Sequence, residues 1–296
     1  MHEVGHTLGL RHNFKASTWK SLKEINNGGK SRPDGNVASV MDYNPVNVVG
    51  KGQPQGDYFT RTVGPYDMWA IEYGYKPLSG GTTGEVEELK KIAARSGEDG
   101  HAYATDEDTR GIDPDPFTNR FDLGDDPVEF AKQRAALVKE LLPDVVDRMT
   151  DEGDDYVQAR RAFNILLSSH GRSMFFAARY VGGLSLSRSH KGDKDAPPPV
   201  EVIDVAKQRE ALKLVGEQVF NEEPYMVPPK AYNYMAASKW NHWGTGSSLR
   251  PDYPVHEVIL MWQDRVLSQL LSPLTLERLH DTALKVPADQ DFFTTA

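Results

Sequence analysis

The sequence predicts a mainly α-helical protein with some β-structure. Apolar residues recur at helical spacing through most of residues 126–296, so that they share one face of each expected helix. Within that region, residues 184–186 and 200–203 carry alternating apolar side chains on either side of a polar turn, which is typical of a β-hairpin. The apolar fraction of 39% is enough to form a packed core.

The composition excludes several classes of function. The formal net charge of −9 argues against nucleic acid or an anionic membrane surface as a partner. The chain contains no cysteine, which excludes disulfides and thiolate metal sites. No window approaches 18 consecutive apolar residues, so we expect no membrane span.

The chain opens on MHEVGHTLGLRHNF, in which His2 and His6 are four residues apart and would project from one helix face. Glu3 lies about 100° around that helix from His2, where it can reach a water without being a ligand. Gly9 lets the helix end and the chain turn, which brings His12 toward the other two imidazoles. Three protein ligands leave a fourth position open, as a catalytic zinc site requires. Isolated histidines are usually ordinary surface or core residues, but five agreeing positions favour a metal site.

The remainder of the first 94 residues is expected to hold two short helices among loops. Residues 13–40 and 44–64 contain many Gly, Pro and Asn residues and are predicted to be irregular. Residues 66–73 predict a short helix that stops at Gly74, and residues 85–94 predict a second helix.

An acidic stretch follows, and its carboxylates are the kind of ligand that Ca²⁺ prefers. Its spacing lacks the EF-hand pattern, so a solvated loop is the simpler interpretation and calcium stays a secondary expectation. The acidic residues are Asp106, Glu107, Asp108, Asp113, Asp115, Asp122, Asp125 and Asp126.

The second half of the chain predicts several amphipathic helices around the hairpin. Asp126 and Pro127 are typical of a helix start, Pro143 of its end, and Asp204 of another helix cap. Further helices are expected around 156–167 with apolar continuation at 173–181, and at 204–220, 256–271 and 274–284. The aromatic cluster around Trp240 and Trp243 is interpreted as core or interface. Six histidines without ligand spacing are interpreted as surface or structural residues: His101, His170, His190, His242, His256 and His280.

The segment from His2 to His12 resembles the metzincin zinc-protease signature H-E-x-x-H-x-x-G-x-x-H. Downstream, SVMDY at 39–43 resembles the methionine turn of the same proteins, although alone it would be interpreted as a strand ending in a turn. The resemblance implies a hydrophobic floor beneath the zinc histidines at Met41. It also implies that Tyr43 reaches the metal or the oxyanion of the reaction.

These two segments, together with GPYDMWAIEYGY, resemble a family of large bacterial zinc-dependent metalloproteases of Met-zincin type. The resemblance implies that residues 1–77 are the lower, C-terminal subdomain of a metzincin-like catalytic domain. Residues 78–125 would then be an acidic connecting region, and residues 126–296 a mainly helical C-terminal domain. The upper subdomain, with the strand that binds substrate, is expected in an N-terminal half of the same polypeptide.

The function implied is that of an exported zinc endopeptidase acting on peptides or proteins, with one catalytic Zn²⁺ held by His2, His6 and His12 and with Glu3 as general base. We expect the chain by itself to be a truncated, inactive fragment that holds zinc poorly, because His2 would lie in a frayed first turn. The alternative is a non-catalytic helical scaffold or binding module that retains a residual zinc motif.

Overall fold

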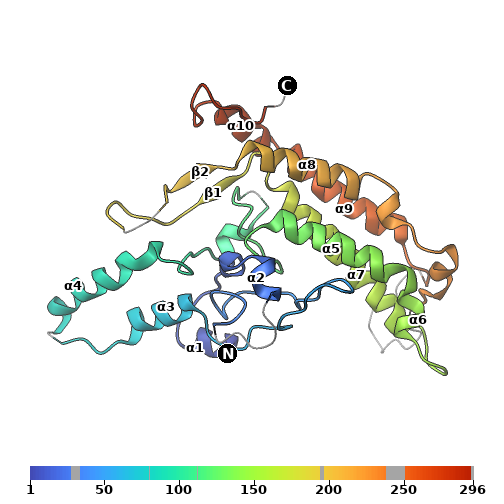
Figure 1. The fold of residues 1–296 in the computed structure, drawn as a ribbon, viewed down its shortest axis with the longest axis horizontal. Helices are drawn as coiled ribbons and strands as arrows, with labels where there is room; N and C mark the ends of the chain where they lie inside the picture. The colour runs from blue at the N-terminus through green and yellow to red at the C-terminus, as the bar shows by residue number, and fades with distance from the viewer. Residues whose placement is uncertain (28–33, 80, 112, 194–196, 238–250, 295–296) are drawn as a thin grey trace.

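The computed structural model describes residues 1–296 except 28–33, 80, 112, 194–196, 238–250 and 295–296 (Figure 1). The expected cluster at Trp240, His242 and Trp243 therefore lies outside the described residues. The longer elements are α1 (His2–Thr7), α2 (Leu22–Asn26), α3 (Pro65–Tyr75), α4 (Gly81–Ala93), α5 (Pro127–Leu141), α6 (Val145–Met149), α7 (Val157–Ala178), β1 (Leu184–Leu186), β2 (Val200–Val202), α8 (Val205–Val219), α9 (Val255–Leu270) and α10 (Pro273–Thr282). The 3₁₀ segments are Ala16–Trp19, Ala94–Gly97, Asp106–Thr109, Leu142–Asp144, Glu223–Tyr225 and Pro229–Tyr234.

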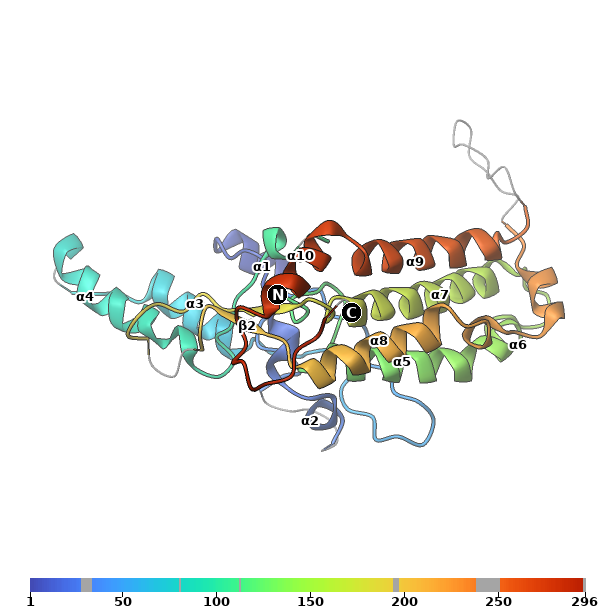
Figure 2. The same ribbon diagram turned by 90° about the horizontal axis from the view of Figure 1, so that it is seen from above.

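Helix α7 is the centre of the second half of the chain, because α5, α6, α8 and α9 all pack against it. Figure 2 shows α5, α7, α8 and α9 running side by side, with α3 and α4 at the opposite end of the molecule. The shared core contains Val128 of α5, Met174 of α7, Val215 of α8 and Val266 of α9, all fully buried. Burial of these apolar faces is the main stabilising term for such a bundle. None of the described helices is both long enough and apolar enough to span a membrane.

The predicted caps and hairpin are confirmed. Asp126 accepts hydrogen bonds from the backbone amides of Val128 and Glu129, and Asp204 accepts one from Lys207 N. Each cap satisfies amides that the first helical turn leaves unpaired. The strands β1 and β2 pair antiparallel, with Leu184 opposite Val202 and Leu186 opposite Val200.

Several element boundaries differ from the prediction. Residues 13–40, predicted to be loop, contain a 3₁₀ turn and the five-residue helix α2, which begins at a capping box of Ser21 and Glu24. Helices this short display too little periodicity to be seen in the sequence. Gly74 does not end α3, which continues to Tyr75, and α4 begins at Gly81, before the predicted 85. Residues 157–178 form one continuous helix, and α6 was not expected.

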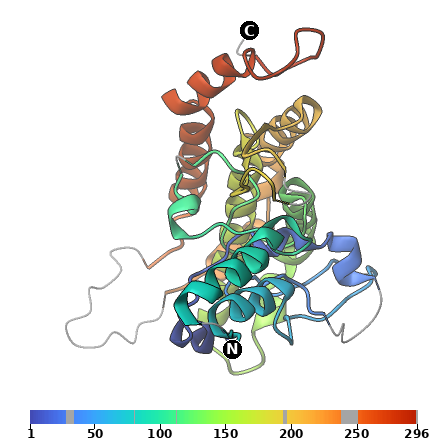
Figure 3. The same cartoon turned by 90° about the vertical axis from the view of Figure 1, so that its left-hand side faces the viewer.

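The irregular first third of the chain is attached to the bundle through a shared core and buried polar contacts. Ile25 and Val37 pack in one buried cluster with Phe130 of α5 and Phe176 of α7. The guanidinium of Arg179, at the end of α7, is buried and donates to the carbonyl of Thr118 and the side chain of Asn119. Figure 3 shows α1, α3 and α4 together on one side of the molecule and α8 and α9 on the other.

Two buried carboxyl groups, Asp42 and Asp122, lie where the loops meet. Asp42 accepts hydrogen bonds from Ser17 N at 2.8 Å and Tyr43 N at 2.7 Å, and Asp122 accepts one from Asn119 Nδ2 at 3.1 Å. Burial raises the pKa of both groups, that of Asp122 to about 6. For Asp42, the neighbouring charge of Asp122 raises the pKa further. The folded chain therefore holds protons here that the unfolded chain releases near pH 4.

We expect this pair to make the protein less stable as the pH rises from about 4 to about 6, because the folded state then loses protons that it binds more tightly than the unfolded state does. Asp122→Asn should flatten this part of the pH profile, measured as the free energy of unfolding in denaturant at each pH. Asp144→Asn, at an exposed carboxylate with 61% side-chain exposure, is the matched control and should leave the profile unchanged. Equal profiles for wild type and Asp122→Asn would contradict the expectation.

Candidate metal centre

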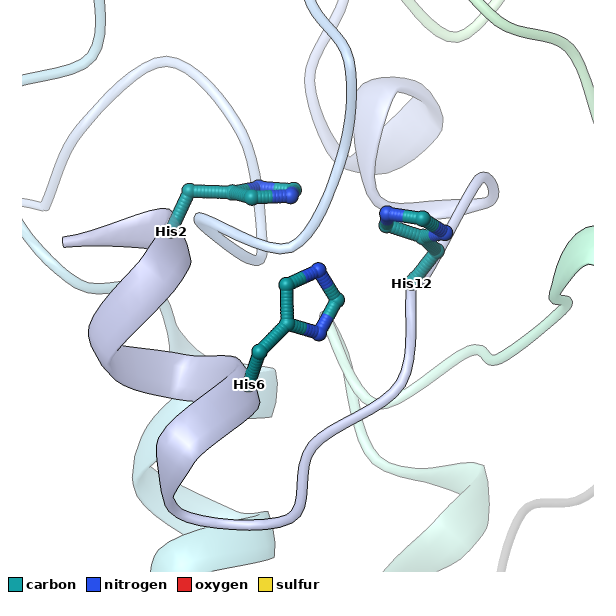
Figure 4. A group of neighbouring side chains, drawn as sticks. All are labelled: His2, His6 and His12. Carbon is teal, nitrogen blue, oxygen red and sulfur yellow. The ribbon is translucent and has the colours of Figure 1, made fainter.

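Three histidines from the opening segment meet at one point. Two come from α1 and the third, His12, from the segment that follows the turn at Gly9, whose φ is +84° (Figure 4). The candidate ligand atoms of His2, His6 and His12 all lie within 4.8 Å of one another. The spacing in the sequence predicted this convergence, and the left-handed glycine supplies the turn that makes it possible.

Each imidazole is oriented by a hydrogen bond at Nδ1. His2 Nδ1 lies 2.7 Å from the carbonyl oxygen of Val40, and His6 Nδ1 lies 2.9 Å from that of Leu10. His12 Nδ1 lies 2.8 Å from Asp106 Oδ2. Because all three partners are acceptors, each Nδ1 carries the hydrogen, and in the neutral imidazole this leaves the lone pair of Nε2 for a metal.

The residues present fit a zinc ion. His12 Nε2 is buried and has no hydrogen-bond partner within the described part of the chain, although buried polar atoms are normally paired. Three neutral imidazole nitrogens are a donor set that zinc accepts, and they leave one position free. His2 was expected to lie in a frayed turn, but the bond to Val40 holds its ring in place.

Met41 lies directly beneath α1. Its side chain is fully buried, and its Sδ is so close to Gly5 that a Cβ at that position would lie 2.2 Å from the sulfur. The residue just before His6 must therefore be glycine for α1 to pack this closely on the methionine. Asn13 N donates to the Met41 carbonyl at 3.1 Å, which ties the segment carrying His12 to the same turn.

The turn that carries Met41 is held in shape by Asp67, near the start of α3. The buried Asp67 carboxylate accepts hydrogen bonds from Ser39 Oγ at 2.5 Å and from Val40 N at 2.9 Å. Met41 N donates in turn to Ser39 Oγ at 3.0 Å. Asp67 therefore fixes the backbone amide of Val40, the residue whose carbonyl accepts from His2. Sequence reasoning missed this residue, because an acidic residue in a first helical turn is common and carries no sign of a distant partner.

Of the two candidate catalytic residues, Tyr43 packs against the histidines, whereas Glu3 is exposed to solvent. The Tyr43 ring lies beside two histidines, with its centroid 5.2 Å from that of His2 and 4.6 Å from that of His12. Glu3 is exposed on α1, next in the chain to His2. His2 and Tyr43 also line a cavity of about 450 Å³, whose other walls include Val37, Val40, Asn44, Asn47, Thr60, Thr62, Phe121 and Leu123.

The acidic stretch reaches the histidines at Asp106, which bonds to His12, whereas Glu107 and Asp125 are exposed. Phe14 N donates to the carbonyl of Ala104 at 2.8 Å, so the residues before Asp106 run alongside the segment that carries His12. Partial burial raises the pKa of Asp106, but the hydrogen bond with His12 and the charges of Arg120 and Arg11 lower it by more, and the net pKa is below the ordinary value.

Calcium finds no support in this geometry. Among the described residues, the one group of three or more His, Asp or Glu ligand atoms close enough for a single ion is that of the three histidines. Two of the other histidines are structural: His101 Nδ1 bonds to the Arg95 carbonyl, and the buried His170 bonds to the Gln218 carbonyl.

The contact between Gly5 and Met41 predicts an unusual response to a mild substitution. Gly5→Ala should destabilise the protein by about 1–3 kcal/mol, as overpacking of a filled core does, although alanine normally favours a helix. Gly216→Ala is the control, because Gly216 is helical in α8 and a Cβ there meets nothing within 4 Å. Denaturant unfolding should separate the two variants. A Gly5→Ala protein as stable as Gly216→Ala would show that Met41 can move aside.

Comparison with known proteins adds one finding to this geometry. A family model described as Met-zincin matches residues 1–295, which is nearly the whole chain. Comparisons with curated proteins and with solved structures gave no match. The motif that brings the three histidines together and the methionine buried beneath them agree with that match, and the chain belongs to the Met-zincin family.

Proposed function

We propose that this protein is a zinc metallopeptidase whose single zinc ion is held by His2, His6 and His12. The observation that carries the proposal is the convergence of three imidazoles whose Nδ1 atoms are already bonded to acceptors. The family match supports the same conclusion, since it implies a zinc-dependent peptidase lineage. A rigid, correctly protonated set of ligands is what a catalytic zinc site needs before the metal arrives.

Bound zinc would lower the pKa of water and polarise the carbonyl of a peptide bond. Glu3 would accept the proton of the attacking water and deliver it to the leaving amine nitrogen, a role that its solvent-exposed position beside His2 allows. Tyr43 would donate a hydrogen bond to the developing oxyanion, since its ring lies against both His2 and His12. Met41 would form the apolar surface on which α1 packs, and so fix the position of that helix.

The substrate we propose is a peptide or protein. The cavity beside His2 and Tyr43 combines apolar walls such as Val37 and Leu123 with amide and hydroxyl groups, and its volume lies within the range of ligand-binding pockets. An exported location stays a prediction of the family resemblance. The alternative of a helical scaffold with a residual motif makes one distinct prediction, which is that the histidines bind no metal.

Measurements of zinc content and of peptidase activity distinguish the role of the histidines from that of Glu3. Glu3→Gln should retain one zinc per chain and lose peptide hydrolysis, because it removes a base and no ligand. His6→Ala should lose both, because two imidazoles bind zinc far more weakly than three. Elemental analysis of the purified protein and hydrolysis of a labelled protein substrate are the measurements.

His101→Ala serves as the histidine control, because its ring bonds to a main-chain carbonyl and stacks on Trp69 away from the three ligands. It should keep wild-type zinc content. Retained hydrolysis in Glu3→Gln would remove Glu3 from the mechanism. Absence of zinc from wild-type protein refolded or grown with zinc would favour the scaffold alternative.

Metal removal should leave the helical bundle folded. The buried core clusters of the described residues contain apolar side chains from α5, α7, α8 and α9 and none of the histidines of the metal centre. The far-ultraviolet circular dichroism should therefore agree before and after treatment with a chelator. A large loss of helical signal would mean that the metal centre, and not apolar burial, holds the bundle together.

A further inference from the structure

His12 differs from the other two candidate ligands in what holds it. His2 and His6 lie on one helix, and their Nδ1 atoms bond to main-chain carbonyls. His12 lies outside the helix, in a segment without regular structure, and its Nδ1 bonds to the side-chain carboxylate of Asp106. The partner is 94 residues away in sequence and belongs to the acidic stretch.

Asp106 is itself fixed at both oxygens. Oδ2 accepts from His12, and Oδ1 accepts from Arg120 Nη2 at 2.8 Å. The guanidinium of Arg120 lies 4.7 Å from the centre of the Phe14 ring, on the segment that carries His12. Arg11 Nη2 is a further cation, 3.9 Å from Oδ2. The carboxylate therefore cannot turn away from the imidazole without breaking a second charged hydrogen bond.

The backbone supports the same placement. Asp106 begins a 3₁₀ turn in which Thr105 N donates to Asp108 Oδ2 at 2.8 Å. Just before it, Ala104 N donates to Asn13 Oδ1 at 3.2 Å, so the two segments are also held together next to the His12–Asp106 contact. Backbone contacts between the two segments therefore support the hydrogen bond between His12 and Asp106, which does not depend on one flexible side chain.

We propose that Asp106 is a positioning residue for the metal centre: it keeps His12 in the tautomer with hydrogen on Nδ1 and aims Nε2 at the other two imidazoles. A carboxylate behind an imidazole does this more strongly than a carbonyl, because its full negative charge stabilises the polarised ring. The inference rests on the proposed function, in which His12 is a zinc ligand.

The test compares Asp106→Ala and Asp106→Asn with Glu107→Gln. Glu107 is the neighbouring carboxylate, exposed and paired with Arg11, and it does not touch His12. Zinc affinity, measured by competition with a chromogenic chelator, should fall about 10–100-fold in Asp106→Ala. Asp106→Asn should fall less, since its amide oxygen still accepts from Nδ1, and Glu107→Gln should stay within about twofold of wild type.

A second readout needs no metal. In metal-free wild type, the ¹⁵N shifts of His12 should show hydrogen on Nδ1, and in Asp106→Ala they should move toward a mixture of tautomers. A purely structural role for Asp106 would not change the tautomer. Thermal unfolding checks that each variant is folded, and Asp106→Asn, which keeps the shape of the side chain, replaces Asp106→Ala if that variant fails to fold.

The outcomes separate the two proposals. Zinc binding by wild type with equal affinity in Asp106→Ala and Glu107→Gln would overturn the role of Asp106 and leave the zinc function standing. An unchanged His12 tautomer in Asp106→Ala would overturn it as well. Failure of wild type to bind zinc while the tautomer shift is observed would overturn the proposed function, and with it the zinc role assigned to Asp106, but not the pairing that orients His12.

Discussion

The contact between Gly5 and the sulfur of Met41 determines where α1 lies, and the position of the candidate metal ligands depends on it. A helix of six residues has too few internal hydrogen bonds to be stable alone, so its position must come from what it packs on. The absent side chain at Gly5 allows the helix backbone to rest on a fully buried methionine. The methionine is held in turn by hydrogen bonds of its own backbone to Asn13 and Ser39.

Those backbone contacts form a chain of buried hydrogen bonds from α3 to the histidines. Asp67 holds Ser39 and the Val40 amide, and the Val40 carbonyl orients His2. One carboxylate near the start of α3 therefore serves both as part of that helix's cap and as the brace of the methionine turn. Low local dielectric makes such fully satisfied polar networks rigid, which suits a site that must hold three rings in fixed orientation.

The expected division of the chain into a catalytic part, an acidic connector and a helical domain stays a prediction, and the packing shows how closely those parts interact. Ile25 and Val37 share a buried cluster with Phe130 and Phe176 of the bundle. The acidic stretch runs along the segment of His12 and supplies its carboxylate partner. The helical bundle thus acts as the support on which the loops of the metal centre are fixed.

The sequence by itself determined the local features: the zinc motif, the glycine turn after it, the helix caps at Asp126 and Asp204, and the hairpin. Each depends on residues a few positions apart, whose relative placement is set by helical or strand geometry. Only the tertiary structure decided the partners of the histidines, because Asp106 lies 94 residues from His12 and the acceptors of His2 and His6 are main-chain carbonyls, which every residue carries. It also decided the short helices α2 and α6, because five residues are too few to show a periodic pattern. Packing stabilises such short helices, and in α2 a capping box does so as well.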